Sequence, residues 1–276
     1  MRLVFFLLVF SNVVSGQESA VRDILQRMSK AGSSVQTARF TIYGEERLRN
    51  GKMFVSERIV KLNVNPHKVY FYSITPDPTM EVLWRQGQKM TVNPGKFPFI
   101  TLKVNHNSKI ARDDSHHSIE DMGFRYLANL INYYMQNYSE KIPKWATIKD
   151  TITWQNHSCI HLVIDFKDFK PEYYTVEKGE NLITIARKLH VNDYMIFSLN
   201  PSVNNLEDVK TGQRILVPNF YATRIEFYID RVNWLPVVQY IYDQKGLYEK
   251  YEFRNLVLNP VFKPDEFTED YKDYRF

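Results

Sequence analysis

The segment RFTIYGEERLRNGKMFVSERIVKLNV (39–64) decides the fold that the sequence predicts. Apolar and polar residues alternate on both sides of Asn50-Gly51, a dipeptide that favours a two-residue hairpin turn. Successive side chains of a strand point to opposite faces, so the second half has one apolar face made of Phe54, Val60, Leu62 and Val64. The segment therefore predicts an antiparallel hairpin that buries one face.

The same alternation continues on both sides of this hairpin. It predicts further strands at 68–74, 80–85, 88–92, 99–104, 147–154, 158–166, 220–230, 237–243 and 247–257. Two segments instead repeat their apolar residues with a helical period, at 18–31 and 117–137. Ser118, followed by Asp121, is a suitable start for the second helix. We expect an α+β fold, a curved antiparallel sheet (a half-barrel) with helices covering its concave side.

Composition limits the class of protein. The chain has 276 residues, of which 44% are hydrophobic and 24% charged, so it can form a real core. Its net charge is only +5 and it contains no cluster of five basic residues, which excludes nucleic acid as the expected partner. Cys159 is the only cysteine, so no internal disulfide can form.

The N-terminus has the pattern of a secretory signal peptide. Arg2 is followed by an apolar run from Leu3 to Phe10, and Val14-Ser15-Gly16 offers small residues before a cut ahead of Gln17. The apolar run is shorter than the roughly 20 residues that cross a bilayer, and no later stretch is long enough. We expect a signal peptide at 1–16, export to the periplasm (cell envelope), and no transmembrane segment.

The stretch 173–218 departs from the β pattern. It reads as strand, helix, helix and strand, its charges sum to zero, and prolines flank it at Pro171 and Pro218. We expect a small domain at 173–218, inserted into a discontinuous host domain formed by 17–172 and 219–276. An insert whose terminal strands pair with each other has its ends close together. It therefore replaces a hairpin turn between the strands 158–166 and 220–230.

The insert YYTVEKGENLITIARKLHVNDYMIFSLNPSVNNLEDVKTGQRILVP closely resembles a LysM domain over its whole length. The matching motifs are Tyr174-Thr175-Val176, Gly179-Glu180-Asn181-Leu182, Leu199-Asn200-Pro201 and Gly212–Pro218. Glu180-Asn181 replaces the more frequent Asp-Thr of that family. The resemblance implies a β-α-α-β unit that binds polymers of N-acetylglucosamine, such as peptidoglycan, in a shallow groove between two loops.

The resemblance also implies which residues contact the glycan. The first loop contributes Gly179, Glu180, Asn181 and Leu182, and the second contributes Asn200, Pro201, Ser202, Val203 and Asn204. Taken singly, these asparagines are also common in turns and at helix starts, where their side chains bond the local backbone. Both interpretations of each asparagine stay open on the sequence alone.

The host carries a looser resemblance. The segments EVLWRQGQ (81–88), VNPGKFPFITLKV (92–104) and SHHSIEDMGFRYLANLI (115–131) resemble an uncharacterised family of exported bacterial proteins. The segment YDQKGLYEKYEFRNLVLNPVFKPDEF (242–267) is similar to the last strands of the LolA/LolB lipoprotein carriers. That fold implies an apolar cavity for acyl chains, with pocket candidates Phe54, Val60, Leu62, Phe71, Trp84, Ile225 and Phe227. An ordinary packed core is the alternative.

No residue pattern indicates catalysis. His157 and His161 lie four apart on a predicted strand, about 13 Å from each other and too far to share one zinc ion. Cys159 is interpreted as a buried, inert thiol, and His116-His117 as surface capping at a helix start. The motifs H-E-x-x-H, G-x-S-x-G and the P-loop do not occur. We expect no enzyme, no metal and no cofactor.

These observations predict a non-catalytic protein of the cell envelope. The insert is expected to bind peptidoglycan or a related polymer of N-acetylglucosamine, and the host a lipid, a lipoprotein or another amphiphile. Two alternatives stay open. One is a peptidoglycan hydrolase, because paired carboxylates need not be close in sequence. The other is a structural envelope protein whose host has no ligand cavity.

Overall fold

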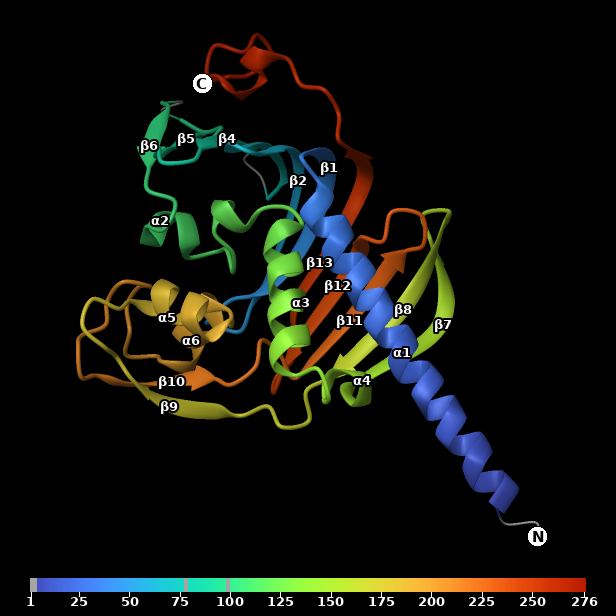
Figure 1. Cartoon of the computed structure of the whole chain (residues 1–276). Coiled ribbons are helices and arrows are strands. Elements are labelled where there is room, and N and C mark those ends of the chain that lie inside the picture. Colours follow the sequence, from blue (N-terminus) through green and yellow to red (C-terminus); the bar gives the residue numbers. More distant parts are fainter. Residues whose placement is uncertain (1–3, 77–78, 98–99) are drawn as a thin grey trace.

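The computed structural model describes residues 4–76, 79–97 and 100–276, so residues 1–3 of the expected signal peptide lie outside it. Figure 1 shows one large sheet, helices lying across one of its faces, and a small unit beside it. The sheet consists of β1 (Thr37–Arg47), β2 (Met53–Val64), β3 (His67–Thr75), β4 (Met80–Arg85), β5 (Met90–Asn93), β6 (Leu102–Val104), β7 (Ala146–Trp154), β8 (His157–Asp165), β11 (Arg224–Asp230), β12 (Pro236–Asp243) and β13 (Gly246–Leu258).

The large sheet is antiparallel throughout. Its strand order is β6-β5-β4-β3-β2-β1-β13-β12-β11-β8-β7, so the first strand lies in the middle and pairs with the last. The hairpin predicted at Asn50-Gly51 joins β1 to β2, and Gly51 has the positive φ of 82° that such a turn needs. The expected α+β fold, a large antiparallel sheet with helices, is confirmed.

Two helices lie across one face of this sheet: α1 (Val4–Ser34) and α3 (Arg125–Asn137) (Figure 1). The predicted stripe of α1 is buried and consists of Val21, Ile24, Leu25 and Met28. A Cβ atom added to Gly32 would lie 2.9 Å from the carbonyl oxygen of Phe124, so the glycine permits close packing of α1 near the start of α3. The shorter helices are α2 (Lys109–Arg112), α4 (Ile142–Trp145), η1 (Ile119–Asp121) and η2 (Pro264–Phe267).

The helix predicted over 117–137 is interrupted. The structure has the single turn η1 at 119–121, capped by the Ser118 side chain, and α3 begins only at Arg125. Gly123 between them has a φ of +100°, and a Cβ there would lie 2.5 Å from Cδ2 of Leu62. Only glycine fits this position, and the break separates 115–121 from the axis of α3.

The insert forms its own small sheet. It consists of β9 (Pro171–Thr175), α5 (Leu182–Leu189), α6 (Asp193–Leu199) and β10 (Arg214–Pro218), and β9 pairs with β10. Since β8 and β11 are neighbours in the large sheet, the unit occupies the place of a hairpin turn between them. Asn181 caps α5, because its side chain accepts a hydrogen bond from the Thr184 N–H while the Thr184 hydroxyl accepts one from the Asn181 N–H.

The apolar core of the insert is continuous with that of the host. The largest cluster of buried apolar residues includes Leu25 of α1, Leu162 of β8 and Ile185 of α5. At the other end of the chain, the C-terminal segment packs against the inner strands β3 and β4, and the ring of Tyr274 stacks 3.7 Å from that of Tyr70. The small unit is therefore docked on the host by burial of apolar surface.

Candidate functional site: an apolar cavity with a polar end

The two halves of the sheet enclose a cavity of about 760 Å³. The strands β1 to β5 turn toward it Ile42, Phe54, Phe71, Val82, Met90 and Val92, and β11 to β13 turn toward it Ile225, Phe227, Ile241 and Phe253. The helix α3 adds Tyr126, Leu127 and Leu130. The wall is mostly apolar because each strand presents one alternating face to this side of the sheet.

Some of the pocket candidates that the sequence suggested line this cavity and others do not. The cavity is lined by Phe54, Phe71, Ile225 and Phe227. Val60, Leu62 and Trp84 are not among its lining residues and are fully buried in the core. Alternation identifies the inward face of a strand, but the packing of distant side chains decides where that face borders a void.

The cavity reaches the surface beside the segment 94–111. Of the residues that line it, Phe97 is 84% exposed, Ile110 85% and Ile100 52%. An exposed apolar patch beside a groove is typical of a ligand or partner site, whereas single exposed apolar residues are not. These three side chains form an apolar rim at the mouth of the cavity.

Polar side chains gather on one part of the wall. They include Glu46 from β1, Tyr251 and Glu249 from β13, and His117 from the loop before η1. Asp114, Ser115, Ser118 and Asp121 of the same segment also line the cavity. The Glu46 carboxylate is buried, and its Oε1 accepts hydrogen bonds from the Tyr251 hydroxyl and from the backbone N–H of His116. Its other oxygen, Oε2, is buried and has no hydrogen-bond partner.

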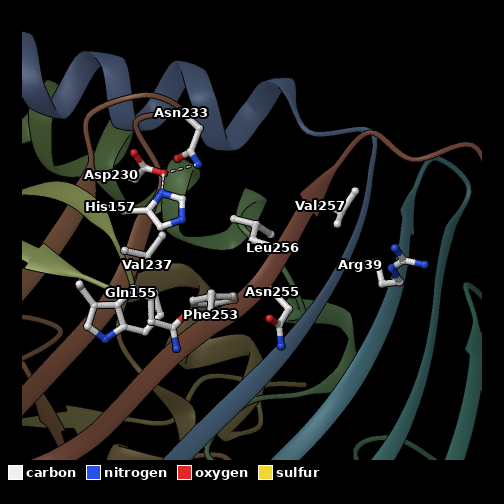
Figure 2. A pocket seen from close by; sticks show the side chains of 11 residues that line it. Arg39, Gln155, His157, Asp230, Asn233, Val237, Phe253, Asn255, Leu256 and Val257 are labelled. Atoms are coloured by element: carbon white, nitrogen blue, oxygen red, sulfur yellow. Dashed lines mark hydrogen bonds and ion pairs between the residues drawn. The ribbon is translucent and has the colours of Figure 1, made fainter.

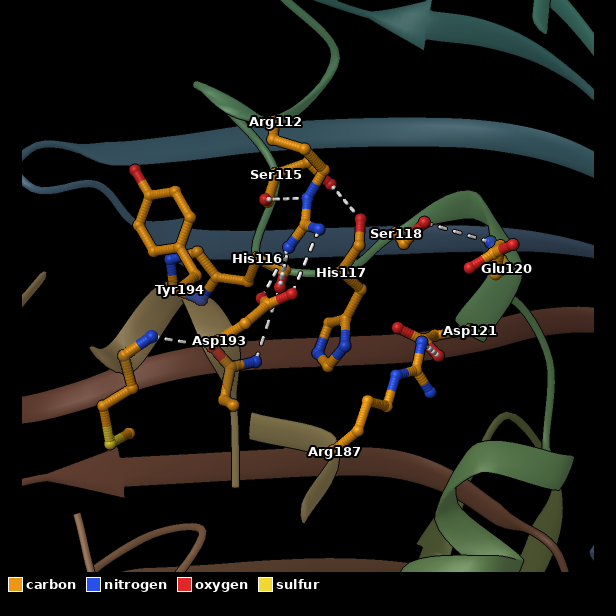
Figure 3. Close-up of polar contacts among 12 residues, drawn as sticks. Arg112, Ser115, His116, His117, Ser118, Glu120, Asp121, Arg187, Asp193 and Tyr194 are labelled. Carbon is orange, nitrogen blue, oxygen red and sulfur yellow. Dashed lines mark hydrogen bonds and ion pairs between the residues drawn. The ribbon is translucent and has the colours of Figure 1, made fainter. Parts of the chain in front are cut away.

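The interpretation of His116-His117 as surface capping is wrong. The side chain of His116 has no exposed surface, and its Nδ1 lies 2.9 Å from Oε1 of Glu249. The side chain of His117 lies 3.4 Å from the second oxygen of the same carboxylate. Both histidines lie in the loop before η1 and not on the helix α3 (Figure 3).

These charges shift each other's pKa. Burial alone raises the pKa of Glu249, but the two neighbouring histidines outweigh burial and lower it to about 2. Burial alone lowers the pKa of His117, but attraction to Glu249 and their hydrogen bond raise it to about 9. At neutral pH the pair therefore carries a protonated imidazole and a carboxylate.

Among the described residues, one guanidinium lines the cavity, that of Arg58, and Lys96 also lines it. Arg58 lies on β2 with its charge 5.4 Å from the centre of the Phe71 ring, and its Nε has no hydrogen-bond partner. It forms no ion pair with any of the described residues. Burial lowers the pKa of Arg58, an effect that the nearby charge of Glu46 opposes.

The insert docks beside this polar part of the wall (Figure 3). Buried Arg112 binds both carboxylate oxygens of Asp193 at 3.2 and 2.7 Å. Asn192, at the start of α6, donates a hydrogen bond of 3.3 Å to Oε1 of Glu249. Arg187 forms an ion pair of 2.8 Å with Asp121. Charged contacts thus join the start of α6 and the end of α5 to the wall of the cavity.

In the first loop expected to bind glycan, most polar groups serve the local fold. Gly179 is exposed and has a positive φ of 83°. The Glu180 carboxylate accepts hydrogen bonds of 2.8 Å from the Tyr174 hydroxyl. Asn181 caps α5, and Leu182 is fully buried.

In the second loop, Pro201, Ser202 and Asn204 are exposed, whereas Asn200 and Val203 are buried. The Asn200 amide bonds the backbone of Ile196 and Leu216, and Asn204 donates to Asp208 at 2.7 Å.

The two loops nevertheless lie beside each other. The Leu182 N–H donates a 2.9 Å hydrogen bond to the Leu206 carbonyl, which ties the first loop to the segment after the second. From the host hairpin, Arg49 donates to the carbonyls of Asn200, Pro201 and Val203 at 3.1 to 3.2 Å. The structure therefore brings the expected residues together, but it already uses several of their polar groups.

A second hollow, of about 610 Å³, lies where β11 turns into β12 (Figure 2). Three of its polar residues, His157, Asp230 and Asn233, are bonded to one another. The buried carboxylate of Asp230 pairs with His157 at 3.1 Å and accepts hydrogen bonds of 2.8 Å from Asn233 and from the N–H of Val232. Nearby Cys159 is buried, and burial raises the pKa of its thiol to about 11, so it is not a nucleophile at neutral pH.

The described residues contain no cluster of three or more histidine, cysteine, aspartate or glutamate side chains placed to hold a metal ion. The two spaced histidines pair separately, His157 with Asp230 and His161 with Glu226. None of the helices in the described part of the chain is long and apolar enough to span a membrane.

Comparison with known proteins places these features in context. A family model described as "Protein of unknown function (DUF1571)" matches residues 35–191, which include β1 to β8 and the first half of the insert. No curated protein sequence matches the chain.

Solved structures that resemble the chain include LprF from Mycobacterium bovis, with a TM-score of 0.45 and 14% identity over 89% of this chain and 96% of that one. The lipoprotein LppX of Mycobacterium tuberculosis has a TM-score of 0.43 and 10% sequence identity, over 88% of this chain and 98% of LppX. A LolA superfamily protein from Nitrosomonas europaea has a TM-score of 0.35 and 8% sequence identity, over 91% of this chain and 98% of that protein.

Proposed function

We propose that this chain, which belongs to the family described as "Protein of unknown function (DUF1571)", binds a lipid or another amphiphile in the cavity of its sheet. The observation that carries the proposal is the mostly apolar cavity of about 760 Å³. Sites for small ligands commonly enclose 300–1,000 Å³ and combine apolar walls with a few polar groups. The charged part of the wall supplies those polar groups.

An acyl chain suits this cavity energetically. Transfer of each CH₂ group from water to apolar surroundings contributes about 0.8 kcal/mol. The exposed rim formed by Phe97, Ile100 and Ile110 gives an acyl chain a continuous apolar path from the surface to the interior. Polar contacts then fix the orientation of the ligand without supplying most of its binding energy.

A fluorescent acyl probe whose emission rises in apolar surroundings tests this function. We expect saturable binding to the full chain, and weaker binding to Ile225→Trp, because the larger ring fills the cavity. The matched control is Tyr228→Trp, which adds the same ring to a neighbouring position of β11 that does not line the cavity. Absence of probe binding and of any lipid that co-purifies with the protein would refute the proposal.

The insert is the second candidate site. We propose that 173–218 is a LysM domain that binds peptidoglycan within a host formed by 17–172 and 219–276. Support comes from the β-α-α-β order and from the adjacency of the two loops. The exposed groups available to a glycan are Gly179, Pro201, Ser202 and Asn204.

Co-sedimentation of the full chain with purified peptidoglycan tests this second function. We expect Ser202→Trp and Asn204→Trp to reduce the bound fraction at least severalfold, because a bulky ring at the exposed edge of the second loop obstructs the groove. Lys210→Trp is the control, since Lys210 is also exposed but lies in another loop of the insert. Release of soluble peptidoglycan fragments would instead favour a hydrolase.

We propose that the protein is non-catalytic and acts in the cell envelope after removal of residues 1–16. The N-terminal end of α1 extends away from the rest of the molecule in Figure 1, so a cut ahead of Gln17 would leave the buried stripe that starts at Val21 intact. Mass spectrometry of the intact protein recovered from the exporting cell tests the cleavage site. A mass that includes the first 16 residues would contradict it.

A further inference from the structure

We infer that Arg58 is the headgroup site of the cavity and binds the anionic carboxylate or phosphate of an acyl ligand. This inference rests on the proposed binding of an amphiphile and adds the chemical class of its headgroup. The residue lies on β2, directly opposite Ile42 of β1 and Ser73 of β3. It is therefore held within the sheet, among residues that line the cavity.

The isolation of this guanidinium is unusual within the molecule. Arg112 has a bidentate carboxylate partner, Arg47 is paired with Asp243, and Arg254 contacts two glutamates. Arg58 instead has no ion-pair partner among the described residues: it faces the Phe71 ring, the charge of Glu46 is nearby, and its Nε has no hydrogen-bond partner. A permanent charge in apolar surroundings is costly unless it is paired, and a guanidinium offers five N–H donors. A bound anion would provide the missing acceptors.

A second unpartnered group lines the same cavity. Oε2 of Glu46 is buried without a hydrogen bond, while Oε1 is fixed by the Tyr251 hydroxyl and the His116 N–H. The charges of Glu46 and Arg58 attract each other, but neither Oε2 of Glu46 nor Nε of Arg58 has a hydrogen-bond partner. The free oxygen is positioned to accept a hydrogen bond from a hydroxyl or ammonium on the same headgroup. One acceptor and one donor that lack partners, in one cavity, fit a polar ligand better than a purely apolar one.

Two kinds of lipid carry such an anion, namely fatty acids and phospholipids. Their shared chemistry is a compact oxyanion at the end of an acyl chain, which the planar guanidinium binds through two hydrogen bonds. The test therefore uses two pairs of ligands with one chain length. Palmitic acid is compared with its methyl ester, and palmitoyl lysophosphatidate with palmitoyl monoglyceride. Within each pair the acyl chain is the same, and only one member carries the anionic group.

Displacement of a neutral fluorescent acyl probe from the full chain measures the four affinities. We expect the wild type to bind at least one anionic ligand about 10- to 100-fold more tightly than its neutral partner, the effect of charge-assisted hydrogen bonds. Arg58→Gln should remove this preference while changing the affinity for the neutral ligand less than about threefold. Arg58→Lys should keep part of it. Arg39→Gln is the control, because Arg39 is exposed and does not line this cavity.

The outcomes separate the headgroup site from the cavity. Equal binding of anionic and neutral ligands by the wild type overturns the role of Arg58 but leaves the cavity as a binding site, and this measurement needs no variant to fold. A preference that survives in Arg58→Gln also overturns it. Failure of all four ligands to displace the probe from a protein that binds the probe limits the cavity to other amphiphiles and overturns the headgroup site. Failure of the probe itself to bind removes the proposed function.

Discussion

The insert and the cavity both contain polar side chains, but these side chains differ in whether they have hydrogen-bond partners. In the insert, Asn181 and Asn200 are bonded to their own segment of chain, through a helix cap and through the backbone of Leu216. In the cavity, Oε2 of Glu46 and Nε of Arg58 have no partners. A polar residue type in a loop therefore does not by itself indicate a ligand. An unpartnered buried polar atom is stronger evidence, because leaving it so is costly.

The contact between these two regions is also informative. The insert contacts the polar part of the cavity wall through Asn192, which donates a hydrogen bond to Glu249, and it pairs with the host beside that wall through Asp193 and Arg112. A binding module that acted independently would not need buried charges at this contact. The following predictions test how far the insert and the cavity depend on each other, from the largest expected effect to the smallest.

The largest effect is expected for Arg112→Met. Removal of the guanidinium leaves Asp193 without its partner at a mostly buried contact, so the free energy of unfolding should fall by about 3 to 5 kcal/mol. Urea denaturation followed by circular dichroism measures it. Lys109→Met is the matched control, because its pair with Asp113 is exposed and should contribute less than about 1 kcal/mol. Equal effects of the two variants would contradict a firm docking contact.

A cavity in the core of the insert gives the next effect. Leu182→Ala should lower the free energy of unfolding by about 2 to 4 kcal/mol, since Leu182 is fully buried. Hydrogen exchange measured by mass spectrometry distinguishes two outcomes. Because the core is continuous, we expect faster exchange also in α3 and β8. Faster exchange confined to 173–218 would show that the insert unfolds by itself.

Stability should depend on pH through the pair His117–Glu249. The pKa of His117 is raised to about 9, so its stabilisation is complete below pH 6.5 and is lost as the pH rises toward 9. The pKa of Glu249 is lowered to about 2, so its stabilisation is lost as the pH falls from 4.5 toward 2. The free energy of unfolding should drop by about 2 kcal/mol between pH 6.5 and 9. His117→Gln should abolish that alkaline drop, and an unchanged drop in this variant would assign it to other groups.

The smallest effect is expected at the helix cap of the insert. Asn181→Ala should cost about 1 kcal/mol, because the side chain closes a capping box with Thr184. Asn204→Ala, which removes only an exposed hydrogen bond to Asp208, should change the free energy of unfolding by less than about 0.5 kcal/mol. Thermal melts of both variants check that Asn181→Ala loses more stability than Asn204→Ala. If Asn204→Ala weakens peptidoglycan binding without changing stability, the asparagine acts on the ligand and not on the fold.

Much of the fold could be predicted from local patterns. The alternation around Asn50-Gly51, the apolar stripe of α1 and the cap at Asn181 each depend on residues within a few positions, and the structure has all three. The helix over 117–137 was predicted too long, because its apolar period continues through Gly123. The close approach of that residue to Leu62, sixty-one positions away, appears only when the chain folds.

The site depended more on tertiary structure. Sequence alone determined which strand faces are apolar, and the resemblance to lipoprotein carriers made Phe71, Ile225 and Phe227 candidates for one interior. Only tertiary structure decided that this interior is hollow, that Arg58 opens into it without a partner, and that His116 is buried against Glu249. The physical reason is the distance along the sequence between the residues that set each feature. Periodicity is set by the local geometry of the backbone, whereas a void or an unpaired charge is set by the summed volume and position of side chains that are distant in sequence.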